Sequence, residues 1–268
     1  FINYLKEKNL YDNTIFIITA DNGPEGNDPS DHAPWRDWIK TTIYDRDYDT
    51  LGDQNSYVYI GTEFAQATAS PSHLFKFHMS EGGLRVPLII SGPGIKKGKN
   101  HQFTFVTDIA ATISDIVFNE VDQRIIGKSL QNSLGGSSEK NYLNSEAIGL
   151  EVTGNSALFK GNFKIVRNRP PNGSNKWELY NLLEDPGETN NLAIKMPKKL
   201  QELIEEYNKY KEKNGVIELP LDYEWASEMT INTFKRNYLP HIKRAIFLIV
   251  VLILTLFLIR RKWRKTKN

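Results

Sequence analysis

A short apolar run near the start of the chain most constrains its fold. Residues 14–20 read Thr-Ile-Phe-Ile-Ile-Thr-Ala, and the four residues at 15–18 are all apolar. Three of these four are β-branched, which favours an extended strand. An uninterrupted apolar run is also typical of a strand that is buried on both faces of a parallel sheet. The sequence therefore predicts an α/β protein with a buried strand at this position.

The residues directly after this run carry oxygen ligands. Asp21 and Asn22 follow the predicted strand, and Gly23 allows the chain to turn. Ligands of open α/β sheets bind beyond the carboxyl ends of the strands. A carboxylate and an amide oxygen together suit a hard cation. A plain surface turn is the alternative, because Asp-Asn-Gly is also favourable turn chemistry.

Lys76 is a second candidate for a functional side chain. It lies among aromatic and apolar residues, shortly before Gly82, Gly83 and a second short apolar run at 86–92. An ammonium group in such surroundings can hold an anion in a site. The alternative is a lysine whose stem lies on a half-buried surface while its charge remains in solvent.

Other patterns exclude sites rather than predict them. His32, His73 and His78 lack metal-ligand spacing, so we interpret them as structural. Gly127-Lys128-Ser129 is similar to the end of a phosphate-binding loop, but Asp122 stands where that loop needs glycine. The chain has no cysteine, which excludes disulfides and a cysteine nucleophile. Its net charge of +2 gives no reason to expect nucleic acid as a partner.

Composition and periodicity divide the chain into parts. Residues 1–130 are expected to form the C-terminal part of the α/β domain. They include a long polar loop at 24–56 and a helix at 104–117. After a Ser/Gly-rich linker, residues 140–215 are expected to form a small antiparallel sheet with one packed helix. The expected strands are 156–160, 163–166 and 177–180, with a hairpin turn at Gly161-Asn162, and the expected helix is 197–213.

The end of the chain has the pattern of a membrane anchor. Residues 245–259 are apolar and uncharged, Lys243 and Arg244 precede them, and six basic residues lie within 260–267. These 15 residues span about 22 Å as a helix, short of the roughly 30 Å hydrocarbon core of a bilayer. Basic side chains at both ends can extend to the interface and make up the difference.

We therefore expect a single-pass membrane helix at 243–262, preceded by a linker at 216–242 and followed by a basic tail at 263–268. The basic tail favours a cytoplasmic C-terminus, with the rest of the chain outside the cytoplasm. A buried core helix is the alternative. The chain also opens at Phe1 inside an apparent helix, so we expect residues upstream and interpret it as the C-terminal portion of a longer protein.

A series of segments, in a fixed order, carries a family resemblance. The segments are 10–15 leading into 20–23, then 55–61, 64–71, Lys76 five residues before 81–87, 107–112, and 177–182 followed by 185–188 and 191–193. Their order and spacing resemble the type I sulfatases of the alkaline phosphatase superfamily, and most closely the bacterial-type arylsulfatases. The resemblance extends from the start of the chain to about Ile217.

This resemblance implies a fold and a reaction. The fold would be the C-terminal part of an alkaline-phosphatase-like sandwich with a mixed or parallel sheet. The activity would be sulfuric ester hydrolysis, on an aryl sulfate or a sulfated glycan. Asp21 and Asn22 take the positions of ligands of one calcium ion (Ca2+), and Lys76 takes the position of a sulfate contact.

The same family uses a formylglycine nucleophile made from Cys or Ser in a Cys/Ser-x-Pro-x-Arg motif. That motif is absent here, as are the paired aspartates that complete the family's metal site. Both are expected upstream of Phe1, so the chain by itself is expected to be inactive. Two other functions stay open: a phosphonate or phosphate ester hydrolase of the same superfamily, and a non-catalytic, membrane-tethered remnant that binds sulfate.

Overall fold

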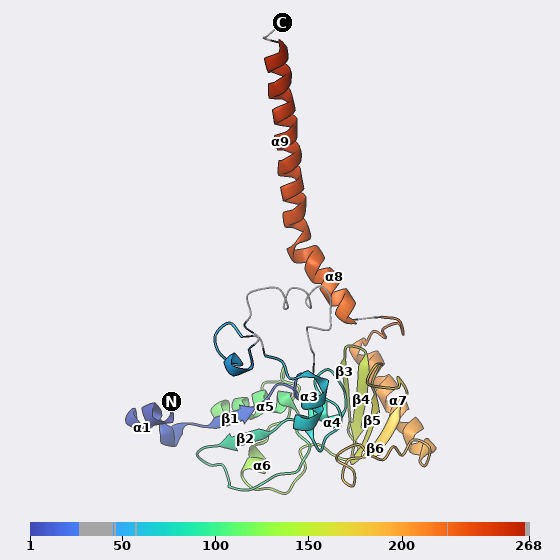
Figure 1. The fold of residues 1–268 in the computed structure, drawn as a ribbon. Coiled ribbons are helices and arrows are strands. Elements are labelled where there is room, and N and C mark those ends of the chain that lie inside the picture. Colours follow the sequence, from blue (N-terminus) through green and yellow to red (C-terminus); the bar gives the residue numbers. More distant parts are fainter. Residues whose placement is uncertain (27–44, 46, 57, 224, 266–268) are drawn as a thin grey trace. The chain divides into compact units, whose positions relative to one another are not determined.

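The computed structural model describes residues 1–26, 45, 47–56, 58–223 and 225–265. Two compact units make up the chain, Phe1–Ile217 and Glu218–Asn268. Figure 1 shows their elements. Most of the predicted loop at 24–56, including His32, lies outside the described residues.

The first unit contains both helices and strands, and its last four strands follow one another directly along the chain. Its described α-helices are α1 (Ile2–Glu7), α3 (Gly61–Ala69), α4 (Glu81–Leu84), α5 (Val106–Phe118), α6 (Gln131–Leu134) and α7 (Pro197–Asn214). Its described 3-10 helices are η1 (Tyr11–Asn13) and η3 (Tyr48–Thr50). Its described strands are β1 (Phe16–Thr19), β2 (Leu88–Ser91), β3 (Ala147–Val152), β4 (Asn155–Lys160), β5 (Phe163–Arg167) and β6 (Glu178–Asn181).

The first sheet pairs β1 with β2, and the two strands are antiparallel. The prediction of a parallel arrangement is therefore wrong for these two strands. Burial on both faces is also wrong, because Ile18 and Ile89, which lie opposite each other, are 59% and 56% exposed. An apolar run shows that a strand can be buried on both faces, but burial needs covering layers. Neither strand has a further strand partner among the described residues.

The second sheet is an antiparallel meander in the order β3-β4-β5-β6. The prediction of a small antiparallel sheet is confirmed, as is the hairpin at Gly161-Asn162, where Lys160 pairs with Phe163. Gly161 has a φ of 60°, in the left-handed region that such a turn requires. Strand β3 was not among the predicted strands.

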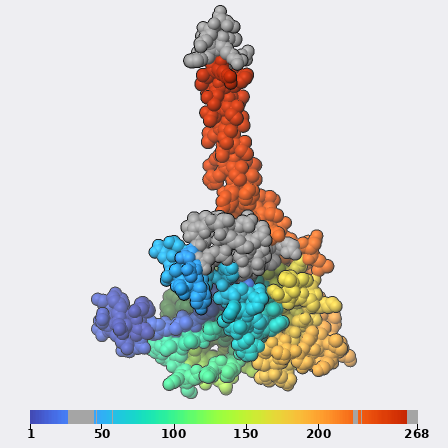
Figure 2. All heavy atoms as spheres, viewed as in Figure 1, coloured from blue at the N-terminus to red at the C-terminus, as the bar shows by residue number. Residues whose placement is uncertain are grey.

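This four-stranded sheet, β3–β6, is called the later sheet from here on. Each of its faces has its own apolar cluster, because successive residues of a strand point to opposite faces. One cluster consists of Met79, Ala157, Phe159, Val166 and Tyr180. The other consists of Leu158, Ile165, Leu179, Leu203 and Tyr207, the last two from α7. Helix α7 therefore covers one face, and the segment that contains Met79 contacts the other. In Figure 2 the blue-green atoms around α3 and α4 lie directly against the yellow atoms of this sheet.

Local sequence signals account for the two longest helices of this unit. Pro197 occupies the first turn of α7, and Gly215 ends it with a φ of 64°. The predicted helix at 197–213 is thus confirmed within a residue. Helix α5 begins where the Asp108 carboxylate accepts a hydrogen bond from the Phe105 N–H at 2.8 Å, which satisfies a free amide at the helix start.

The second unit consists of α8 (Trp225–Asn237) and α9 (Leu239–Lys265). Within α9, Leu239–Arg260 is long and apolar enough to cross a membrane, and none of this stretch is buried within the described chain. Its exposure does not match the alternative of a buried core helix.

Candidate functional site

The loop after β1 lies tightly against the turn that forms α4. The Gly23 N–H donates a hydrogen bond to the Gly83 carbonyl at 3.1 Å. A Cβ atom at position 23 would lie 1.8 Å from the Gly82 carbonyl oxygen, which is far inside van der Waals contact. Only glycine permits this approach, so Gly23 fixes the position of the preceding Asp21 and Asn22 relative to α4.

The segment that contains Lys76 joins the same assembly from the other side. The Lys76 N–H donates to the Pro24 carbonyl at 3.0 Å, and the Gly82 N–H donates to the His73 carbonyl at 2.8 Å. Gly26 packs against the Phe75 ring, where a Cβ atom would lie 2.4 Å from a ring carbon. Backbone contacts thus bring together three segments: 21–26, 73–79 and 81–84.

The side chains of Asp21 and Asn22 leave oxygen atoms available. Asp21 is exposed, and within the described part of the chain its carboxylate has no side-chain hydrogen bond or ion pair. The Asn22 amide nitrogen donates to the Gly23 carbonyl at 2.9 Å, which leaves the amide oxygen as an acceptor. One charged and one neutral oxygen therefore stand next to each other at the end of β1.

This donor pair fits part of a calcium site. Calcium takes about six to eight oxygen ligands in proteins. Within the described ranges, no group of three or more His, Asp or Glu side chains could hold a metal ion. Asp21 and Asn22 therefore match the chemistry of such a site but not its full number of ligands.

Lys76 makes an ion pair that the sequence did not predict. Its Nζ lies 2.8 Å from Oε2 of Glu25, and the two side chains are 29% and 43% exposed. The ammonium also lies 5.2 Å from the centre of the Phe77 ring. Glu25 follows Asp21-Asn22-Gly23 closely in sequence. This proximity was the only feature of the sequence that could have indicated Glu25 as a residue of the candidate site. An anion that binds Lys76 would meet Glu25 as a neighbour and competitor.

His78 is buried close to this assembly. Its Nδ1 lies 3.0 Å from the Phe75 carbonyl, so this nitrogen carries the proton, and Asn172 donates to Nε2 at 3.3 Å. Burial is the main cause that lowers the pKa of His78, and the charge of His73 lowers it further. Both hydrogen bonds suit a neutral ring.

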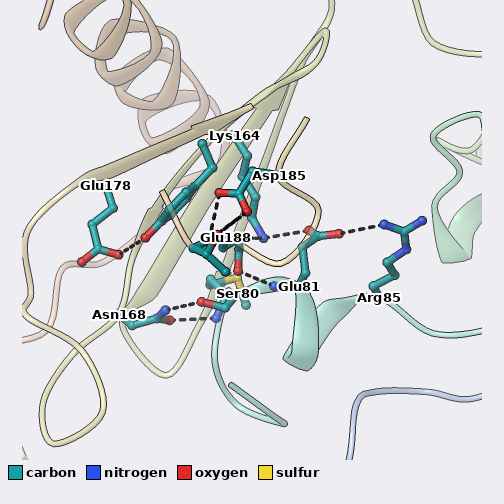
Figure 3. A network of polar contacts seen from close by, with 11 residues as sticks. Ser80, Glu81, Arg85, Lys164, Asn168, Glu178, Asp185 and Glu188 are labelled. Atoms are coloured by element: carbon teal, nitrogen blue, oxygen red, sulfur yellow. Dashed lines mark hydrogen bonds and ion pairs between the residues drawn. The ribbon is translucent and has the colours of Figure 1, made fainter. Parts of the chain in front are cut away.

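A buried polar network lies directly after the Lys76 segment and was not predicted (Figure 3). Lys164 is fully buried, and its Nζ lies 2.9 Å from Glu81 Oε1 and 2.7 Å from Glu188 Oε1. Arg85 lies 3.8 Å from the other oxygen of Glu81. The one available signal was a lysine on the same face of β5 as the apolar Val166, two residues further on.

Comparisons with known proteins add a family to this geometry. A family model described as sulfatase matches residues 1–119. A second model, described as N-sulphoglucosamine sulphohydrolase, C-terminal, matches residues 72–214. The two matches together cover the whole assembly of segments around Lys76.

Similar curated proteins are sulfatases. A sulfatase of Schizosaccharomyces pombe, described as uncharacterised, is 32% identical over 83% of this chain and 42% of its own length. The N-acetylgalactosamine-6-O-sulfatase of Bacteroides thetaiotaomicron is 26% identical over 76% of this chain and 37% of its own length. Arylsulfatase K of Xenopus laevis is 26% identical over 55% of this chain and 30% of its own length. The chain thus spans less than half the length of each of these relatives.

Solved structures share the fold. A structure from work on glycosaminoglycan metabolism by Bacteroides thetaiotaomicron matches with a TM-score of 0.52 and 24% identity, over 79% of this chain and 41% of that one. The crystal structure of Ps i-CgsB matches with a TM-score of 0.56 and 18% identity, over 88% and 44%. At these identities the likeness shows the α/β fold alone.

Proposed function

The chain belongs to the sulfatase family, and we propose that the full-length protein is a sulfuric ester hydrolase. One observation carries this proposal: the Asp21-Asn22-Gly23 loop and the Lys76 segment meet against α4 through direct backbone contacts. Sequence positions that the family resemblance assigns to a cation and to sulfate are thereby neighbours in the fold. The proposed substrate class is an aryl sulfate or a sulfated glycan.

The proposed role of Lys76 is to contact the sulfate group. Negative charge builds on the sulfate and leaving-group oxygens as the S–O bond breaks. A fixed ammonium beside those oxygens stabilises that charge, and it does so more strongly in a partly buried site than in water. The Lys76 side chain is held at its base by the hydrogen bond to Pro24 and is paired with Glu25. Substrate sulfate would share or replace the Glu25 carboxylate as the partner of the ammonium.

We also propose that Asp21 and Asn22 hold one calcium ion together with ligands from outside this chain. When bound, the ion supplies positive charge beside the sulfate oxygens. Asp21 and Asn22 have the right oxygen donors for this, and Gly23 holds them near the Lys76 segment. The formylglycine nucleophile would also come from outside, because the chain has no cysteine and no Ser-x-Pro-x-Arg motif. The 268-residue chain alone should therefore be inactive.

The proposed location follows from α9. Its apolar stretch Leu239–Arg260 would anchor the protein in a membrane, with the basic tail in the cytoplasm and the sulfatase part on the other side.

The test uses the full-length protein, with its upstream sequence, in a host that makes formylglycine. Membranes from these cells should hydrolyse 4-nitrophenyl sulfate, lose that activity with EDTA and regain it with calcium. Deletion of 243–268 should move the activity to the soluble fraction. Lys76→Ala should lower kcat/KM by about 100-fold or more, whereas Lys96→Ala, at an exposed position, should leave it unchanged.

Three outcomes would contradict parts of the proposal. Preferential hydrolysis of 4-nitrophenyl phosphate or a phenylphosphonate would point to a phosphoryl-transfer enzyme of the same superfamily. Binding of sulfate without turnover of any ester would point to the non-catalytic remnant. Activity of the 268-residue chain alone would show that the nucleophile lies within it.

A further inference from the structure

We propose that a polar clamp from the later sheet positions Lys76, so that this sheet is a working part of the sulfate site. The inference rests on the proposed role of Lys76. The clamp consists of Asn155, Lys164, Asn168 and Glu188, and it acts on the segment 77–81 that directly follows Lys76.

The clamp holds this short segment at nearly every residue. Asn155 Nδ2 donates to the Phe77 carbonyl at 2.7 Å. Asn168 Oδ1 accepts from the Met79 N–H at 2.8 Å, and Asn168 Nδ2 donates to Ser80 Oγ at 2.9 Å. The segment has no regular backbone pairing of the kind found in helices and sheets. Hydrogen bonds from the Asn155 and Asn168 side chains set its path instead.

Glu81 receives the strongest contacts. Its N–H donates to Glu188 Oε2 at 2.8 Å, and its carboxylate accepts from Lys164 Nζ at 2.9 Å. Lys164 also lies 2.7 Å from Glu188 Oε1 (Figure 3). The two carboxylates exceed the single ammonium by one negative charge, and Arg85 at 3.8 Å from Glu81 offsets it. Charged groups that are buried in this way keep their geometry, because any displacement leaves a charge without its partner.

The backbone next to Lys76 shows why an external clamp is needed. Phe77 has a φ of 72° and Leu74 a φ of 58°, conformations that non-glycine residues rarely adopt. Such strain persists only where the surroundings over-determine it. Pro24 holds the Lys76 N–H on one side, and Asn155 holds the Phe77 carbonyl on the other. Lys76 is thus fixed between the loop after β1 and the later sheet.

The main test compares two variants of the full-length protein. Lys164→Met removes the centre of the clamp. Leu203→Ala destabilises the same sheet from its other face, where Leu203 packs against Leu158 and Tyr207 without contacting the segment 77–81. Assays are run well below both melting temperatures. Lys164→Met should lower kcat/KM for 4-nitrophenyl sulfate, and raise the inhibition constant of inorganic sulfate, each by at least about tenfold. Leu203→Ala should change neither by more than about twofold.

A second variant serves if Lys164→Met does not fold. Asn155→Ala removes the bond to Phe77 without leaving a buried charge, and it should weaken sulfate inhibition in the same direction but less. Equal effects of the clamp variants and Leu203→Ala at matched losses of melting temperature would overturn the inference. So would unchanged sulfate inhibition in Lys164→Met.

A third readout does not depend on activity. Competitive acetylation of the full-length protein with acetic anhydride measures how freely the Lys76 amine leaves its pair with Glu25. The Lys76 rate should rise at least about threefold in Lys164→Met and not in Leu203→Ala. A wild-type enzyme without sulfatase activity would refute the proposed function, while this rate would still decide the positioning. An unchanged rate would refute the positioning even in an active sulfatase.

Discussion

The two sheets of the first unit differ in how completely they are covered. The later sheet has an apolar cluster on each face, and Leu158, Ile165 and Leu179 are fully buried. The β1–β2 pair has two strands, and its opposed Ile18 and Ile89 are more than half exposed. Both sheets are rich in apolar residues, so composition alone does not decide burial.

This difference separates the packing that buries the later sheet from the contacts that position the candidate site. The later sheet is covered on one face by α7 and on the other by the segment that contains Met79. The loop after β1, in contrast, carries the proposed ligands on a thinly covered pair of strands. That loop is located instead by backbone contacts, chiefly that of Gly23 with α4. The candidate site thus depends on packing supplied from elsewhere in the chain.

The largest expected effect tests whether side-chain packing stabilises the later sheet more than the β1–β2 pair. Leu203→Ala should lower the free energy of unfolding of the later sheet by about 2–5 kcal/mol, because it leaves a cavity against Leu158 and Tyr207. Ile18→Ala in β1 should cost less than about 1 kcal/mol, because that side chain is mostly exposed. Urea unfolding of the 268-residue chain in detergent, followed by hydrogen exchange of the β1 and β4 amides, measures both. Comparable costs would mean that the two sheets are equally covered.

An intermediate effect tests the backbone contact. Gly23→Ala would place a Cβ atom 1.8 Å from the Gly82 carbonyl oxygen, so the loop or α4 must shift. We expect a loss of about 1–3 kcal/mol from this overpacking. Gly98→Ala is the matched control, because nothing lies within 4 Å of a Cβ there. Similar unfolding curves for the two variants would show that the loop after β1 is held by something other than this contact.

The smallest effect is a pH dependence at His78, where the Lys76 segment contacts Asn172 in the loop between β5 and β6. Burial lowers the pKa of His78 below the value of about 6.5 expected in the unfolded chain. The unfolded chain therefore takes up this proton first, and the stabilising contribution, complete above about pH 6.5, is lost as the pH falls toward the folded-state pKa. Between about pH 7 and pH 5.5, His78→Asn should show a shallower loss of stability than the wild type. His101→Asn, on an exposed loop, should keep the wild-type slope.

Local signals predicted the local structure of the later sheet well. The Gly161-Asn162 turn and the Pro197 and Gly215 boundaries of α7 were readable because each depends on a few neighbouring residues. The antiparallel pairing of β1 and its exposure could not be predicted from the sequence, because they depend on which strand and which covering layers the fold places beside β1.

The candidate site divides in the same way. Asp21, Asn22 and Lys76 were identified from motif and resemblance, and their roles stay predictions. The ion pair of Lys76 with Glu25 and the buried contacts of Lys164 were missed, because no local pattern connects residues so far apart in the chain. A charged side chain on the apolar face of a strand is the kind of exception that deserves a search for distant partners.

The clamp also has a consequence for how the protein is made. Its bonds join residues that lie 78 to 107 positions apart. Contacts of such long range form late, because the intervening chain must first be synthesised and the loop closed. On the ribosome, Lys76 emerges long before Glu188, so the segment that contains Lys76 is synthesised well before all of its partners in the later sheet are available. A nascent chain that stops short of Glu188 would leave Glu81 without one of its partners, a state that quality control can recognise as unfinished.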